Sequence, residues 1–188
     1  MEQRAFLTEI RAAEGEETRV SGLGIVYDQW TELWPGYMER ISKGAVKNAE
    51  TVKSFFNHDP DYVLSTLDSD PALVLRETDN GMEYDSPIPP TTYGNDLKIN
   101  LQRKNVRGSS FAFDVAHDAW SQDDKGIMYR DITDLTLYEV GPVTNPAYIQ
   151  TTASVRSKEL VKEQRKKLSQ VPLELRKKQQ LQVEKDRS

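Results

Sequence analysis

Apolar and polar side chains alternate in short runs along the first 156 residues, and glycine, proline, asparagine or aspartate separate these runs. A period of two is typical of strands with one buried face. Asn80-Gly81 lies between two such runs and predicts a tight hairpin. Gly141-Pro142 is expected to end the last run, which we expect to break near Asp134. The predicted strands cover residues 19–27, 72–76, 82–86, 109–116 and 127–140.

Two other segments have patterns that favour helices. Tyr93, Leu97 and Leu101 recur every four residues, which places them on one face of a helix that runs to about Asn105. A second helix is expected over residues 44–54, directly before Phe55. The chain has no internal repeat. The hydrophobic pattern therefore predicts an α+β, β-rich domain with few helices.

A shift in composition near Arg156 divides the chain. Residues 157–188 contain ten basic and five acidic residues but no aromatic residue and no glycine, so this segment carries a net charge of +5. Because the whole chain carries −5, residues 1–156 carry −10. This asymmetry predicts a domain over 1–156 and a basic, helical and largely solvated tail over 157–188.

The tail offers weak signals for partners. Val161, Leu168 and Leu175 recur every seven residues, as in a coiled coil, but Pro172 should interrupt the helix. Nucleic acid is not an expected partner, because the tail lacks aromatic residues and the preceding domain is acidic.

Composition also excludes several classes of protein. The chain has no cysteine, so disulfides, thiolate catalysis and cysteine-bound zinc or iron–sulfur clusters are excluded. The N-terminus lacks the apolar core of a signal peptide, and no apolar run approaches the roughly 20 residues of a membrane span. We therefore expect a cytoplasmic protein without a membrane partner.

The segment Gly108-Ser109-Ser110-Phe111-Ala112-Phe113 is the first candidate for chemistry. Alternation places Ser110, Ala112 and Asp114 on one face of a strand and the two phenylalanines on the other, which we expect to face the core. A serine opposite that core could line a cleft, and Gly108 permits a close backbone approach. Alternation alone does not choose between Ser109 and Ser110, and a simple strand start after a loop is the competing interpretation.

Only two histidines are available to activate a serine hydroxyl, which is a poor nucleophile until a base takes its proton. His117 lies seven residues after Ser110, so a straight strand would place it on the opposite face, next to the polar loop 121–125. His58 is therefore favoured by elimination. The same segment, Asn57-His58-Asp59-Pro60, also has the composition of an ordinary turn.

A third group should orient the imidazole of His58. Glu139 lies in an otherwise apolar strand end, where a carboxylate is costly unless it has a partner. Asp114 shares the predicted face of Ser110 and remains the competitor. Asp59 is too close to His58 in sequence to reach around the ring easily.

Together, these motifs resemble the prohead maturation proteases of tailed bacteriophages. The resemblance covers about residues 3–156, including Gly22-Leu23-Gly24, Pro35-Gly36 and the segment 42–46 near the N-terminus. Two positions depart from the family pattern: Ala112 stands where the family often has glycine, and Gly141 where it often has serine. The motifs that carry the resemblance are Asn57-His58-Asp59, Gly108 to Phe113, and Leu137 to Tyr148 with its final Pro146-Ala147-Tyr148.

The resemblance implies a fold similar to that of herpesvirus assembly proteases: a closed or nearly closed β-barrel with surrounding helices, plus the helical C-terminal tail. It implies a serine endopeptidase in which Ser110 is the nucleophile, His58 the base and Glu139 the third member, without a cofactor or metal. Oxyanion donors are expected from backbone N–H groups near Ser110 or from the loop 143–145.

The resemblance also implies partners and a location. The substrates are expected to be the major capsid protein precursor with its scaffold segment, other prohead proteins and the protease itself, with a homo-oligomer by analogy. The site of action is the assembling prohead in the host cytoplasm. Two alternatives remain: a catalytically silent scaffold or assembly barrel that acts through its basic tail, and another serine hydrolase such as an esterase. The absence of a Gly-x-Ser-x-Gly sequence argues against the esterase.

Overall fold

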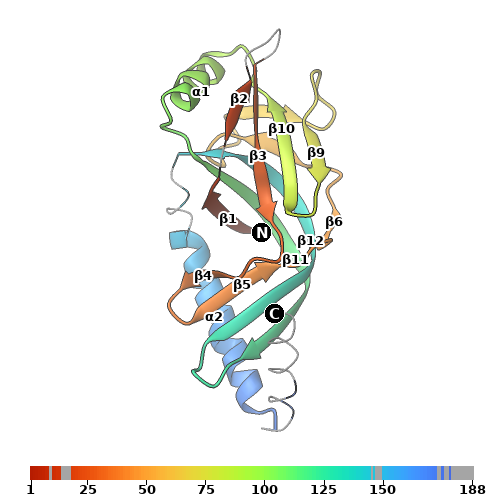
Figure 1. The fold of residues 1–188 in the computed structure, drawn as a ribbon, viewed down its shortest axis with the longest axis vertical. Coiled ribbons are helices and arrows are strands. Elements are labelled where there is room, and N and C mark those ends of the chain that lie inside the picture. The colour runs from red at the N-terminus through yellow and green to blue at the C-terminus, as the bar shows by residue number, and fades with distance from the viewer. Residues whose placement is uncertain are drawn as a thin grey trace.

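The computed structural model describes residues 1–8, 10–13, 18–144, 146, 150–172, 175 and 178. Two long neighbouring strands, β11 and β12, form a hairpin that runs through the middle of the molecule (Figure 1). The elements, in chain order, are β1 (Glu2–Leu7), β2 (Arg11–Ala13), β3 (Arg19–Val26), β4 (Thr31–Trp34), β5 (Tyr37–Ile41), β6 (Val46–Asn48), β7 (Lys53–Phe55), β8 (Val63–Thr66), β9 (Val74–Glu77), β10 (Gly81–Pro87), α1 (Thr92–Gln102), β11 (Gly108–Gln122), β12 (Met128–Val143) and α2 (Gln150–Ser169).

The strands form two sheets. The larger has the order β1-β11-β12-β5-β4, with β6 and β7 also paired in parallel to β12 and with β8 paired to β7. The smaller has the order β2-β3-β10-β9. Strand β12 therefore pairs with four other strands, so its residues are held in position by most of the larger sheet.

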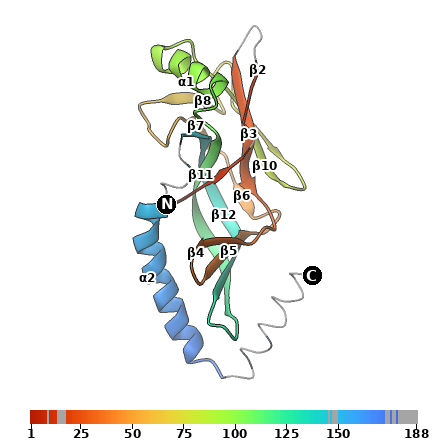
Figure 2. The same cartoon turned by 60° about the vertical axis from the view of Figure 1, so that its left-hand side comes forward.

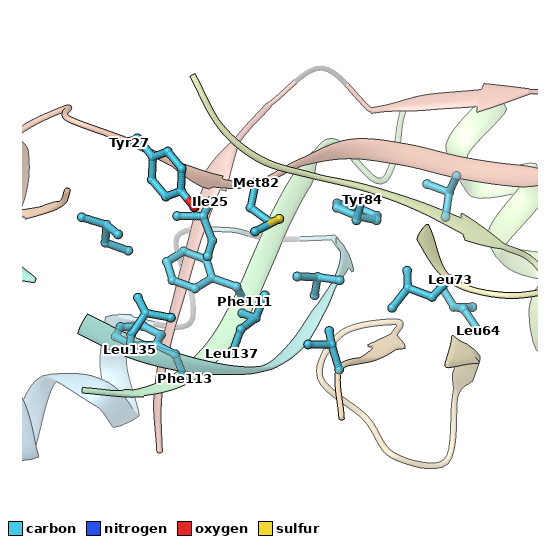
Figure 3. Close-up of a cluster of buried hydrophobic side chains, with 14 of the residues drawn as sticks. Ile25, Tyr27, Leu64, Leu73, Met82, Tyr84, Phe111, Phe113, Leu135 and Leu137 are labelled. Carbon is cyan, nitrogen blue, oxygen red and sulfur yellow. The ribbon is translucent and has the colours of Figure 1, made fainter. Parts of the chain in front are cut away.

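The main core lies between the two sheets and joins them face to face. Ile25 from β3 and Tyr84 from β10 pack in one cluster with Phe111, Phe113 and Leu137 from the hairpin (Figure 3). In the described part of the chain the strands form two sheets, with an isolated bridge between Tyr27 and Ile41, and no closed barrel is found. The β-rich fold with few helices is as predicted, and the nearly closed barrel stays a prediction.

The strongest sequence patterns are confirmed. Strand β3 and the β9–β10 hairpin around Asn80-Gly81 form where alternation predicts them. The helical stripe forms α1, with Leu97 and Leu101 buried, although the helix ends three residues before Asn105. Thr91 caps this helix, because its Oγ1 accepts a hydrogen bond from the N–H of Gly94 at 3.2 Å. Local pattern and tertiary packing agree at these elements.

The helix expected over residues 44–54 is wrong. This segment instead forms the short strands β6 and β7, which pair in parallel with β12. Ala45 and Val52 are fully buried against the main core. Pairing with a long neighbouring strand and burial of small apolar side chains override the local helical preference.

The expected strand end at Gly141-Pro142 is also wrong, because β12 continues through both residues to Val143. Proline lacks a backbone N–H but keeps its carbonyl, and the Pro142 oxygen accepts a hydrogen bond from Asn57 N at 3.1 Å. The predicted break near Asp134 corresponds to irregular pairing rather than to a gap, since the register between the two hairpin strands shifts there.

A buried ionic cluster joins the N-terminal strand to the middle of the larger sheet. The Glu39 carboxylate accepts hydrogen bonds from Arg4 Nε at 2.6 Å, from Tyr37 Oη at 2.8 Å and from Arg130 Nη1 at 3.2 Å. Arg130 also bonds both oxygens of Glu2 at 2.9 and 3.0 Å. Burial alone would raise the pKa of Glu39, but the two guanidinium groups hold it below its ordinary value.

A second, smaller core holds helix α2 against the outer side of β5 and the hairpin (Figure 2). Val161 and Leu168 are buried there against Tyr37 and Met128, beside the stacked rings of Trp34 and Tyr37. These two apolar positions of the heptad-like stripe therefore face the domain, whereas the sequence predicted a largely solvated tail. Most positions after Pro172 lie outside the described residues.

Candidate active site

The two neighbouring serines of β11 have opposite environments. Ser109 Oγ lies 3.1 Å from Tyr84 Oη in a buried hydrogen bond, and burial raises the pKa of that tyrosine, which keeps it neutral. Ser110 is also buried, but its Oγ has no hydrogen-bond partner among the described residues. The side chain of Ser110 is 1% exposed, so it does not open to a cleft as the alternation suggested. Of the two, only Ser110 has a hydroxyl without a hydrogen-bond partner among the described residues, a state that it shares with Ser54 on β7.

The pairing of β11 with β12 brings Ser110 close to Glu139. Ser110 stands opposite Gly141, and Ala112 stands opposite Glu139. Since side chains alternate along each strand, Ser110 and Glu139 share one face of the hairpin, and the core residue Phe111 lies on the other. The extra residue in β12 comes beyond this point, between Ala112 and Phe113 in the pairing.

His58 reaches the same region from a third strand. Strand β7 pairs with β12 at Glu139 and Val140, and the chain then turns so that His58 follows three residues later. His58 Nδ1 lies 2.7 Å from Glu139 Oε1, and both side chains are less than a tenth exposed. The two atoms are at ion-pair distance without the alignment of a formed hydrogen bond. The described contacts therefore join the histidine to the carboxylate of Glu139.

The competing residues lie elsewhere. Asp114 is half exposed, and its Oδ1 lies 2.6 Å from the amino group of Met1. His117 is exposed further along β11. Of the expected oxyanion donors, the N–H of Thr144 donates to Asn57 Oδ1 at 2.9 Å, and Asn145 lies outside the described residues. Ser110 itself is the third residue of β11 and lies between two paired strands, β1 and β12, toward which its backbone groups are directed.

Two glycines near Ser110 allow close backbone approaches. A Cβ on Gly108 would lie 2.8 Å from Pro146 Cγ, in agreement with the expectation of a close approach there. A Cβ on Gly141 would lie 2.0 Å from the carbonyl oxygen of Phe55, at the end of β7. The chain therefore has glycine at position 141, where the family often has serine, because the end of the strand that leads to His58 lies too close for a side chain.

Replacing Gly141 by alanine is expected to displace β7, because the new methyl group would overlap a backbone oxygen that no rotamer change can move. We expect a loss of about 1 to 3 kcal/mol in the free energy of unfolding, measured by urea titration. Gly24→Ala is the matched control, since the nearest atom there is a side-chain methyl carbon of Val140 at 3.1 Å. Equal losses in both variants would contradict this interpretation.

The described residues offer no alternative chemistry at this site. They contain no group of three or more His, Asp or Glu side chains that could hold a metal ion. What remains is an unpartnered serine hydroxyl next to a histidine–carboxylate pair, the side-chain set of a serine hydrolase.

Neither α1 nor α2, within the described residues, has the length and apolar composition of a membrane-spanning helix.

Comparisons with known proteins identify the family. The model of the caudovirus prohead serine proteases matches residues 7–166, so the chain belongs to this family and is a serine protease. The capsid assembly protease gp21 of bacteriophage T4 is a similar solved structure, with 14% sequence identity and a TM-score of 0.44 over 78% of this chain and 100% of that chain. No curated protein matches the chain. Membership of the family sets the esterase alternative aside.

Proposed function

We propose that Ser110 is the nucleophile of this protease, that His58 is its general base and that Glu139 orients the imidazole. The observation that carries the proposal is the 2.7 Å contact between His58 Nδ1 and Glu139 Oε1, beside a buried serine hydroxyl on the neighbouring strand. A carboxylate at Nδ1 favours the tautomer that carries its proton there, which leaves Nε2 free to accept another.

The reaction follows from these positions. Ser110 Oγ attacks the carbonyl carbon of the scissile peptide bond while its proton passes to His58 Nε2. The C–N bond then breaks as the imidazolium returns that proton to the leaving amine, and the acyl-enzyme remains. Water adds to the ester carbonyl with the histidine again as base, which releases the new carboxylate and restores Ser110. Glu139, which is buried, stabilises the imidazolium in both steps.

The hydrogen bond between nucleophile and base is not formed in this structure. Ser110 Oγ and His58 Nε2 are both buried, and neither has a hydrogen-bond partner among the described residues. Catalytic hydrogen bonds often tighten only when substrate is bound. We propose that a peptide in the site brings these two atoms into contact by a shift of the loop that carries His58.

The substrates that we propose are proteins of the assembling prohead. They comprise the major capsid protein precursor with its scaffold segment, other prohead proteins and the protease chain itself, all inside the prohead in the host cytoplasm. Membership of the prohead protease family supports this proposal. We also propose that the active domain ends near Arg156 and that self-cleavage removes the basic tail.

Removal of the tail near Arg156 would have a structural consequence, because this position lies inside α2. The second half of the helix carries Val161 and Leu168, which pack on Tyr37 and Met128. Self-cleavage there would uncover the smaller core. The mature enzyme would then present aromatic rings that the full chain covers.

Coexpression of the chain with its capsid protein precursor tests the proposal. Intact-mass measurement should show shortened capsid protein and a shortened protease with the wild type, and full-length species of both with His58→Ala. His117→Ala is the matched control and should process like the wild type, because His117 is exposed and away from Glu139. Unprocessed capsid protein with an active wild-type chain would overturn the proposed substrate, and normal processing by His58→Ala would overturn the proposed mechanism.

A further inference from the structure

The loop that carries His58 has an unusual backbone. Asn57 and His58 have φ angles of 58° and 59°, so two successive residues that are not glycine occupy the left-handed region. Asparagine and histidine are both enriched among the few non-glycine residues at such angles, but the conformation still costs energy for either residue. Strained backbone persists only where surrounding contacts hold it. The contacts of this loop therefore determine where the imidazole points.

Asn57 supplies the contacts that tie this loop to β12. Its Oδ1 accepts hydrogen bonds from the N–H of Thr144 at 2.9 Å and from Thr144 Oγ1 at 3.2 Å. Its own N–H donates to the carbonyl of Pro142 at 3.1 Å. Pro142 and Glu139 both lie on β12, and Thr144 directly follows the end of that strand, so the anchor of the loop and the partner of the imidazole are close together along the chain.

The remaining hydrogen bonds of the loop are internal. Asp59 N donates to the carbonyl of Phe56 at 3.2 Å, and Phe56 N donates to the carbonyl of Tyr62 at 3.1 Å. These bonds shape the turn but do not reach β12. The Asn57 side chain is exposed, so it contributes little to the hydrophobic core. We therefore expect its hydrogen bonds to fix the orientation of the loop and to contribute little to the free energy of unfolding of the domain.

We propose that Asn57 is a positioning residue for the protease reaction, whose hydrogen bonds to Thr144 hold the His58 ring with Nδ1 at Glu139. The proposal rests on the catalytic role given to His58 under Proposed function. Without the Asn57 side chain, the ring can rotate away from Glu139 and lose its preference for one tautomer. The amide of Asn57 acts only through His58 and does not contact the reacting atoms.

The two-histidine composition makes this orientation directly measurable. We would record imidazole ¹⁵N–¹H correlation spectra of the full chain at mildly alkaline pH, with His117→Ala to assign the signals. His58 of the wild type should show a single tautomer with the proton on Nδ1. Asn57→Ala and Asn57→Gly should show averaged tautomers, whereas Asn57→Asp keeps the acceptor oxygen and should retain the single form.

Each variant separates one explanation from another. Asn57→Gly adopts positive φ readily, so it removes the acceptor without straining the turn. Asn48→Ala is the matched control: Asn48 Oδ1 also accepts a backbone N–H, from Glu50 at 3.1 Å, but it has no tie to the His58 loop. We expect the wild-type tautomer in this control. An unchanged His58 tautomer in both Asn57→Ala and Asn57→Gly would overturn the proposal.

The rate of cleavage of the capsid precursor, measured at varied precursor concentration, gives an independent test. Asn57→Ala should lower kcat about 10- to 100-fold and leave KM unchanged, because a small misplacement of a catalytic group costs rate rather than binding. In a Glu139→Gln background the same replacement should cost nothing further. A full additional loss in that background would overturn the proposal. The ¹⁵N measurement remains decisive even if Ser110 proves not to be the nucleophile.

Discussion

Ser110→Ala is expected to lower turnover about 10⁴- to 10⁶-fold, the range found when the nucleophile of a serine protease is removed. The reason is that the neighbouring buried serines are placed elsewhere. Ser54 Oγ also lacks a partner among the described residues, but Ser54 pairs with Val140 and therefore lies on the face opposite to Glu139. Ser109 is next in sequence, but its Oγ is bonded to Tyr84 Oη and lies on the other side of the strand. Single-turnover cleavage of the capsid precursor, followed by mass spectrometry, measures this effect.

Ser109→Ala is the matched control for this prediction. It removes the buried hydrogen bond to Tyr84, so it should cost about 1 kcal/mol in the free energy of unfolding. Turnover should stay close to that of the wild type, because Ser110 and the contact between His58 and Glu139 are untouched. Wild-type cleavage by Ser110→Ala combined with loss of cleavage in Ser109→Ala would show that Ser109, and not Ser110, is the nucleophile.

Arg130→Met is expected to destabilise the fold by about 3 to 5 kcal/mol, because it removes one of the two guanidinium groups that face the cluster and leaves Arg4 to balance both Glu2 and Glu39. The Arg130 side chain is 3% exposed and bonds Glu2, Glu39 and Asp118. The methionine fills similar volume, so the loss reports the uncompensated charge rather than a cavity. Thermal and urea denaturation measure this loss.

Arg76→Met provides the comparison for an exposed ion pair. Arg76 and Glu83 are 69% and 45% exposed, so their pair at 3.3 Å should contribute at most about 1 kcal/mol. A similar loss in both arginine variants would contradict the role given to buried charge.

The cluster around Glu39 also predicts a pH dependence of stability. The pKa of Glu39 is lowered in the folded chain, so the contribution of this carboxylate to the free energy of unfolding is full above the ordinary glutamate pKa of 4.5 and is lost as the pH falls further.

The periodic parts of the fold were predictable because their side chains and their neighbours favour the same structure. Strand β3, the hairpin at Asn80-Gly81 and helix α1 each bury the apolar face that the sequence marks. Residues 44–54 were mispredicted because β12, which lies more than seventy residues further along the chain, supplies their hydrogen-bond partners. Long-range pairing leaves no trace in a local pattern.

The candidate site was predictable only in part. The scarcity of histidine pointed to His58, and the cost of a carboxylate in an apolar strand pointed to Glu139, which the structure places 2.7 Å from His58 Nδ1. The sequence did not reveal the ties of Asn57 to Thr144, since these residues are 87 positions apart. The sequence showed glycine at position 141 where the family often has serine. Only the structure gave the reason, which is the close carbonyl oxygen of Phe55.

The uneven length of the strands around the site has a consequence for how the enzyme opens. Ser110 and Glu139 lie on strands of 15 and 16 residues, which can exchange their amide hydrogens only when much of the larger sheet unfolds. His58 follows a strand of three residues, which can separate from β12 in a small local opening. We therefore expect access to the buried hydroxyl of Ser110 to depend on movement of the His58 side of the site, while the side formed by β11 and β12 stays fixed.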